Sequence, residues 1–114
     1  MEPLGEPEAL SASKMIGSRV VNHDGEDVGK IQDVMIDPDS GRVTYAILSF
    51  GGFLGMGDKL FAIPWPSLRR DVDGRQFLLH VHKDRLRNAP GFARNDWPPM
   101  GDTYWGTDVP KFWT

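Results

Sequence analysis

The chain has 114 residues, enough for one domain with a single hydrophobic core of modest size. Its net charge of −3 and its 25% of charged residues are ordinary for a globular protein, and they exclude wholesale disorder or a fibrous protein. It contains no cysteine, which excludes disulfide bonds, thiolate metal sites and cysteine nucleophiles.

Two further classes of protein are disfavoured by the distribution of apolar residues. No apolar run approaches the roughly 20 residues that a membrane-spanning helix needs. The first residues also lack the basic and apolar regions of a secretory signal. We therefore expect a cytoplasmic protein without an integral membrane segment.

Residues 1–12 combine prolines, acids and small side chains without periodicity, and they predict a flexible N-terminal extension. A domain is expected to begin at residue 13, with a first short strand over residues 19–21. The following Asp24-Gly25 pair tolerates the positive φ angles of a tight hairpin turn. The sequence therefore predicts a β-hairpin at the start of the domain.

The second predicted strand covers residues 28–36. Its apolar positions change phase between Ile31 and Val34, which a regularly alternating strand cannot do without turning a side chain outward. We predict a β-bulge near Gln32 and Asp33.

The next two predicted strands are residues 42–50 and 60–63. Pro38 and Gly41 favour a hairpin turn before the first of them. Both faces of residues 42–50 are substantially apolar, so this strand should be covered on both sides. The second strand ends at Pro64-Trp65-Pro66, where two prolines stop the ladder of hydrogen bonds and Trp65 is expected to close one end of a barrel.

The last third of the chain predicts a further hairpin, a helix and a tail. Residues 67–70 and 76–82 flank a glycine-bearing turn, and residues 83–89 form a short helix that Pro90-Gly91 terminates. Residues 91–114 carry three of the four tryptophans but show no strand or helix period. We expect them to form an irregular, aromatic-rich tail that packs on the barrel or on a partner.

Four segments, taken in this order and spacing, resemble the PRC-barrel family: residues 13–17 (SKMIG), 29–37 (GKIQDVMID), 45–55 (YAILSFGGFLG) and 61–65 (FAIPW). That family includes the cytoplasmic domain of the photosynthetic reaction centre H subunit, the C-terminal domain of ribosome maturation factors and stand-alone bacterial proteins. The resemblance implies a small, highly curved antiparallel β-barrel over residues 13–90 that docks partners. It implies no catalytic set of residues.

The glycine-rich loop from Gly51 to Asp58 differs from a phosphate-binding loop. No Gly-Lys-Ser or Gly-Lys-Thr sequence follows it, and the next element is a strand rather than a helix. Its apolar residues Phe53, Leu54 and Met56 leave two interpretations open. They either fill the core beneath the loop or form an exposed surface for a partner.

The titratable residues predict no catalytic, cofactor-binding or metal-binding site. His80 and His82 lie two apart on a predicted strand and could share a metal, but we expect His23 to be distant and find no third ligand nearby. The carboxylates gather in predicted turns, where they are expected to make local hydrogen bonds: Asp24, Glu26, Asp27, Asp37 and Asp39.

We therefore predict a non-enzymatic adaptor that binds a protein partner and forms a homodimer, because a small barrel interior covers only one face of the strand at residues 42–50. The alternative is an RNA- or ribosome-associated factor that uses the region from Arg69 to Arg94, where basic residues outnumber acids. The candidate interaction surface consists of apolar and aromatic residues in the glycine-rich loop and the tail: Phe53, Leu54, Met56, Trp97, Tyr104 and Trp105.

Overall fold

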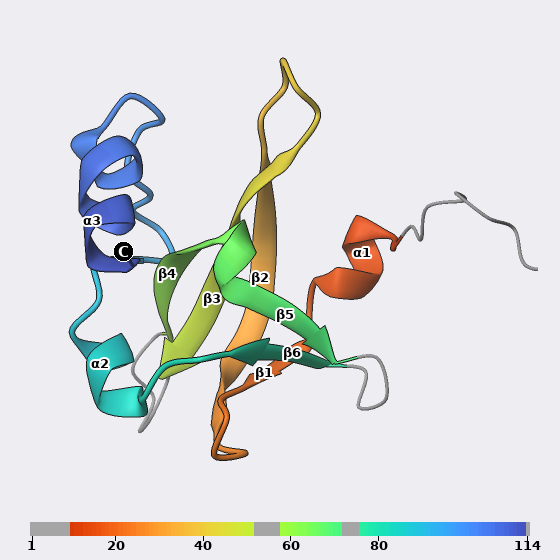
Figure 1. The fold of residues 1–114 in the computed structure, drawn as a ribbon. Helices are drawn as coiled ribbons and strands as arrows, with labels where there is room; N and C mark the ends of the chain where they lie inside the picture. Colours follow the sequence, from red (N-terminus) through yellow and green to blue (C-terminus); the bar gives the residue numbers. More distant parts are fainter. Residues whose placement is uncertain (1–9, 52–57, 72–75, 114) are drawn as a thin grey trace, which may run out of the picture.

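A computed structural model describes residues 10–51, 58–71 and 76–113 of the chain. Within these ranges the protein is mainly β, with one seven-stranded sheet (Figure 1). The strands are β1 (Arg19–Val21), β2 (Asp27–Ile36), β3 (Val43–Gly51), β4 (Asp58–Pro64), β5 (Leu68–Asp71), β6 (Gln76–Leu79) and β7 (Gly91–Ala93). The helical elements are α1 (Ala12–Met15), the 3₁₀ turn η2 (Trp65–Ser67), α2 (Lys83–Arg87), the π-helical turn η3 (Tyr104–Asp108) and α3 (Val109–Trp113).

The strands follow the order β5-β6-β1-β2-β3-β4-β7 across the sheet. Antiparallel pairing holds for every neighbouring pair except β1 and β6, which run parallel with Val20 opposite Phe77. The prediction of an entirely antiparallel sheet was therefore wrong at this pair. The reason is topological: β6 turns back from β5 and enters beside β1 in the same direction. Within the described residues no pairing joins β5 to β7, so closure into a barrel stays a prediction.

Local sequence signals placed the central hairpin correctly. The Asp37 carbonyl accepts a hydrogen bond from the Gly41 amide, and Gly41 has a φ of +74°. The register of β2 against β3 shifts between Ile31 and Asp33, which confirms the predicted bulge. The β2–β3 hairpin extends well beyond the other strands (Figure 1).

β2 and β3 approach each other closely at Gly29. This residue has a φ of +121°, and a Cβ atom built on it would lie 2.1 Å from the Ser49 carbonyl oxygen. A side chain at this position therefore meets backbone rather than movable atoms. Gly29 sets how tightly the two longest strands can pack.

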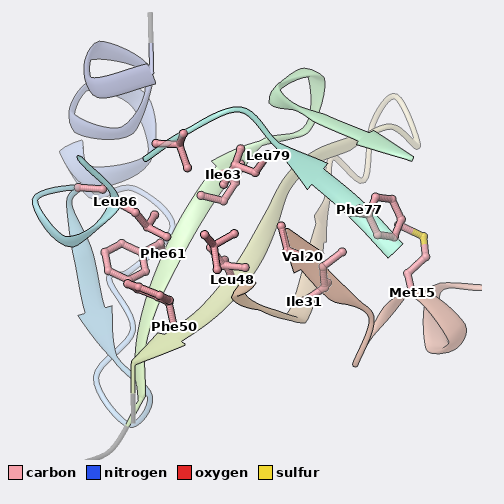
Figure 2. Close-up of a cluster of buried hydrophobic side chains, with 13 residues drawn as sticks. Met15, Val20, Ile31, Leu48, Phe50, Phe61, Ile63, Phe77, Leu79 and Leu86 are labelled. Carbon is pink, nitrogen blue, oxygen red and sulfur yellow. The ribbon is translucent and has the colours of Figure 1, made fainter. Parts of the chain in front are cut away.

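One hydrophobic cluster fills the concave side of the sheet (Figure 2). It joins Leu48 and Phe50 of β3 to side chains from α1, the neighbouring strands and α2. Trp65 packs against this cluster, and its ring centroid lies 6.2 Å from that of Phe77. The other members are Met15, Val20, Val28, Ile31, Phe61, Ile63, Leu79, Val81, Leu86 and Ala89.

A second cluster covers the opposite face of β3 and β4, where Ile47, Leu60 and Ala62 are fully buried. Its cover comes from the same chain: Phe92 of β7, Tyr104 and Trp105 of η3, and Val109 of α3. The prediction that both faces of this strand are covered is confirmed. The prediction of an irregular tail was wrong, because the tail forms three elements that are each too short to leave a period in the sequence.

The Tyr104 hydroxyl links the tail to the sheet. It accepts a hydrogen bond from the Ala62 amide at 3.1 Å and donates one to the Pro90 carbonyl at 3.0 Å. β7 pairs with β4 only as far as Gly91, so the hydroxyl stands where the next strand residue would pair. Burial raises the pKa of Tyr104 to about 12, so this hydroxyl keeps its proton at alkaline pH values where an exposed tyrosine would lose it.

None of the helices in the described ranges is both long enough and apolar enough to cross a lipid bilayer.

Candidate functional site

An open groove of about 560 Å³ lies where the first half of β2 and the end of β3 meet the α1–β1 connection and α2. Ile31, which is 1% exposed, and Phe50, which is 9% exposed, form its apolar floor. Ile16 stands at its edge with 41% of its surface exposed. The groove therefore has a largely buried apolar floor and one exposed apolar side chain, Ile16, at its edge.

The sides of the groove are predominantly basic. Lys30 on β2 and Lys83 and Arg87 on α2 line it, together with the single carboxylate of Asp27. Both oxygens of the Asp27 carboxylate already have partners. Oδ1 accepts a hydrogen bond from the Gly29 amide at 2.9 Å, and Oδ2 lies 3.4 Å from Arg19 Nε. An incoming carboxylate or phosphate would thus meet a net positive surface.

The backbone around the groove is well fixed. Gly17 has a φ of +93° and turns the chain from α1 into β1. Its amide donates to the Ile31 carbonyl at 2.7 Å, and the Ile31 amide donates to the Ser18 carbonyl at 2.9 Å. These bonds attach the α1–β1 connection to β2, so this side of the groove is preformed.

The residues of the predicted interaction surface differ in their placement: three lie outside the described residues, and the other three are partly or almost fully buried. Phe53, Leu54 and Met56 lie outside the described residues, although Gly51, just before them, lines the groove. Trp97 is half-buried, and its ring packs at a tilt against that of Phe92 with centroids 4.9 Å apart. Its Nε1 group donates a hydrogen bond to the Arg94 carbonyl.

Tyr104 and Trp105 are 6% and 7% exposed. Their rings pack edge to face at 5.0 Å, and the Trp105 Nε1 group donates to the Pro98 and Pro99 carbonyls. Burial leaves these two side chains almost no surface for a partner. Both belong to the hydrophobic cluster that covers β3 and β4.

The basic stretch from Arg69 to Arg94 does not form one patch. Arg69 and Arg70 lie on β5, at one end of the strand order, whereas α2 lies on another side of the molecule (Figure 1). Arg85 of α2 turns toward the tail, where it donates to the Phe112 carbonyl at 2.7 Å and lies over the Phe112 ring. Of the basic residues in this stretch that the structure describes, only Lys83 and Arg87 line the groove.

The turn carboxylates behave as local hydrogen-bond acceptors. Asp37 accepts from the Asp39 amide at 2.9 Å, and this bond holds the pKa of Asp37 below its usual value. The prediction of local backbone hydrogen bonds is confirmed for Asp37 and Asp27.

Sequence reasoning missed Lys30 as a partner of Lys83 in the groove. No local pattern connects two lysines that are 53 positions apart by their numbers. Their proximity depends on the sheet, which brings the segment after β6 beside the start of β2. The sequence feature that came closest to indicating the groove was the break in apolar alternation after Ile31, because it marked this part of β2 as irregular.

Comparison with known proteins gives a family and a fold. A family model described as PRC-barrel domain matches residues 7–86, which is more than half of the chain. The match begins within the predicted extension at residues 1–12 and ends before residue 90. No curated protein matches the chain.

Among solved structures, the chain is similar to one from Pseudomonas aeruginosa that is named for RimM and 16S ribosomal RNA processing, with a TM-score of 0.50 and 12% identity. The similarity covers 73% of this chain but 50% of that one, so this chain spans about half the length of its structural relative. At this identity the likeness concerns the fold alone. The family match over residues 7–86 shows that the chain belongs to the PRC-barrel domain family.

Proposed function

We propose that this chain is a non-enzymatic docking module that binds an acidic, partly apolar segment of a partner protein in the groove. The observation that carries the proposal is the combination of an apolar floor, Ile31 and Phe50, with the cations of Lys30 and Lys83. Among the described residues, neither lysine has a carboxylate within ion-pair distance. Their charges are therefore available to an incoming chain.

The size of the groove fits this role. Its volume of about 560 Å³ lies within the range of about 300–1,000 Å³ found for ligand sites. An extended segment that alternates acidic and apolar side chains would place the acids near the lysines and the apolar groups on the floor.

Charge reversal in the groove should weaken binding of an acidic peptide. The probe is a fluorescein-labelled peptide that alternates glutamate and leucine, and its affinity is measured by fluorescence anisotropy. We expect the double variant Lys30→Glu/Lys83→Glu to bind at least about tenfold more weakly, because like charges then face each other across the contact.

The matched control is Arg42→Glu/Arg69→Glu, which makes the same change in net charge at two exposed arginines outside the groove. It should retain most of the affinity. Equal losses in both double variants would mean that the peptide responds only to net charge, and the groove would not be the docking site.

Self-association and a cytoplasmic location stay predictions. The tail already covers the second apolar face of β3, so a second chain is not needed for that purpose. Exposed apolar residues such as Ile36, at 53%, still offer contacts to a second copy. Light scattering at micromolar concentration should report twice the monomer mass, and a monomer at every concentration would contradict the homodimer.

RNA or ribosome association is the second candidate function. The specific observation in its favour is the likeness to a structure named for 16S ribosomal RNA processing, together with the basic sides of the groove. The same variants separate the two candidates. Salt-dependent binding to ribosomal RNA that Lys30→Glu/Lys83→Glu reduces, with no binding of the acidic peptide, would favour RNA over a protein partner.

A further inference from the structure

All three histidines of the chain lie together in the structure, although they come from distant parts of the sequence. The ring centroid of His23 is 4.3 Å from that of His80 and 5.3 Å from that of His82. The prediction that His23 is distant from the other two was therefore wrong. Asp24, the residue after His23, lies within the same cluster.

The parallel pairing of β1 and β6 brings these residues together. Val20 lies opposite Phe77 and Val21 opposite Leu78. When this register is continued past the ends of both strands, His23 falls opposite His80. The prediction placed them apart because His23 lies in a hairpin far along the sequence from His80 and His82, and no local pattern shows that the two strands are paired.

We propose that His23, Asp24 and His82 form a binding site for Zn²⁺. The His23 Nε2 atom lies 3.6 Å from one Asp24 carboxylate oxygen, and the His82 Nδ1 atom lies 3.9 Å from the other. One ligand atom from each of the three residues lies within 4.8 Å of the others. Two imidazoles and one carboxylate are a donor set that zinc accepts.

The distances are close to those of a bound ion. Tetrahedral zinc with bonds of about 2.0–2.1 Å holds its ligand atoms about 3.4 Å apart. The side chains of His23, Asp24 and His82 are 39%, 52% and 71% exposed. Small rotations of these side chains into solvent-accessible space can therefore bring the donors into contact with one ion, with a fourth position left to water.

The surrounding residues hold the donors near this arrangement. Asn22 is 1% exposed, and its side-chain oxygen accepts hydrogen bonds from the Asp24 and Glu26 amides at 3.0 and 2.9 Å. This fixes the backbone of the turn that carries two ligands. The His80 ring lies against the His23 ring and limits its rotation, so we assign His80 a positioning role.

The zinc site is distinct from the groove, because none of its three ligands lines that surface. The two proposals can therefore fail independently. Retained zinc binding in Lys30→Glu/Lys83→Glu would show that the two sites are separate.

Isothermal titration of the full chain, purified without a histidine tag, with zinc chloride tests the proposal. We expect saturable binding of one ion per chain. His23→Ala and His82→Ala should each weaken it at least about 100-fold, since loss of a group beyond the ligands alone costs about 10- to 100-fold. His80→Ala should cost less than either ligand variant.

Asp24→Asn should also weaken zinc binding, whereas Asp39→Asn, the same change at an exposed carboxylate in another turn, should not. Nuclear magnetic resonance gives a second readout, because zinc should shift the imidazole resonances of His23 and His82. An absence of saturable heat, or unchanged affinity in the double variant His23→Ala/His82→Ala, would overturn the proposal.

Discussion

Replacement of Gly29 by alanine is expected to lower the free energy of unfolding by about 3–5 kcal/mol. The new Cβ would lie 2.1 Å from the Ser49 carbonyl oxygen, much closer than atoms can approach. Relief would require β2 and β3 to separate at the centre of the sheet. The φ of +121° adds backbone strain for any residue other than glycine.

Urea denaturation followed by tryptophan fluorescence measures this loss. The matched control is Gly41→Ala, at the turn that joins the same two strands, where φ is +74° and nothing lies within 4 Å of an added Cβ. It should cost only about 1–2 kcal/mol, because backbone strain is its main penalty. Similar losses at the two positions would show that strain, rather than close approach of the strands, explains the Gly29 result.

Trp105→Ala is expected to have the second largest effect on stability, with a loss of about 3–5 kcal/mol and a fall in Tm of more than about 10 °C. Trp105 is 7% exposed and packs among Tyr45, Phe92 and Tyr104. Its removal leaves a cavity over β3 and β4. It also removes the hydrogen bonds that Nε1 donates to the Pro98 and Pro99 carbonyls.

Thr107→Ala, an exposed change in the same π-helical turn, should alter stability by no more than about 0.5 kcal/mol. Trp105→Phe provides an intermediate variant if alanine abolishes folding, since it keeps an aromatic ring but no Nε1 donor. Thermal unfolding monitored by circular dichroism compares the three. A Tm for Trp105→Ala within a few degrees of the wild type would mean that η3 does not pack on the sheet in solution.

Local features of the fold were accessible from the sequence. Gly41 marked the turn between β2 and β3 because a positive φ favours glycine there. The phase change after Ile31 marked the bulge because alternation is a property of neighbouring residues. Predictions of this kind depend on interactions between residues that are close in the sequence, and a single sequence shows which residues those are.

Non-local features were not accessible. The parallel pairing of β1 with β6 joins segments whose sequences carry no sign of each other, and both the histidine cluster and the groove depend on that pairing. The prediction for the tail differed from the structure for another reason. Tyrosine and tryptophan are common on exposed binding surfaces, but the same amphipathic rings are equally suited to covering a sheet, as Tyr104 and Trp105 do here.

The cover of the second apolar face has a consequence for the family as a whole. The family match ends at residue 86, whereas the covering residues Phe92, Tyr104, Trp105 and Val109 all follow it. The family match thus covers less of the chain than the unit that folds here. A relative that retains residues equivalent to Ile47 and Leu60 but continues differently after the match must shield them by another route, such as its own distinct C-terminal segment or a neighbouring chain.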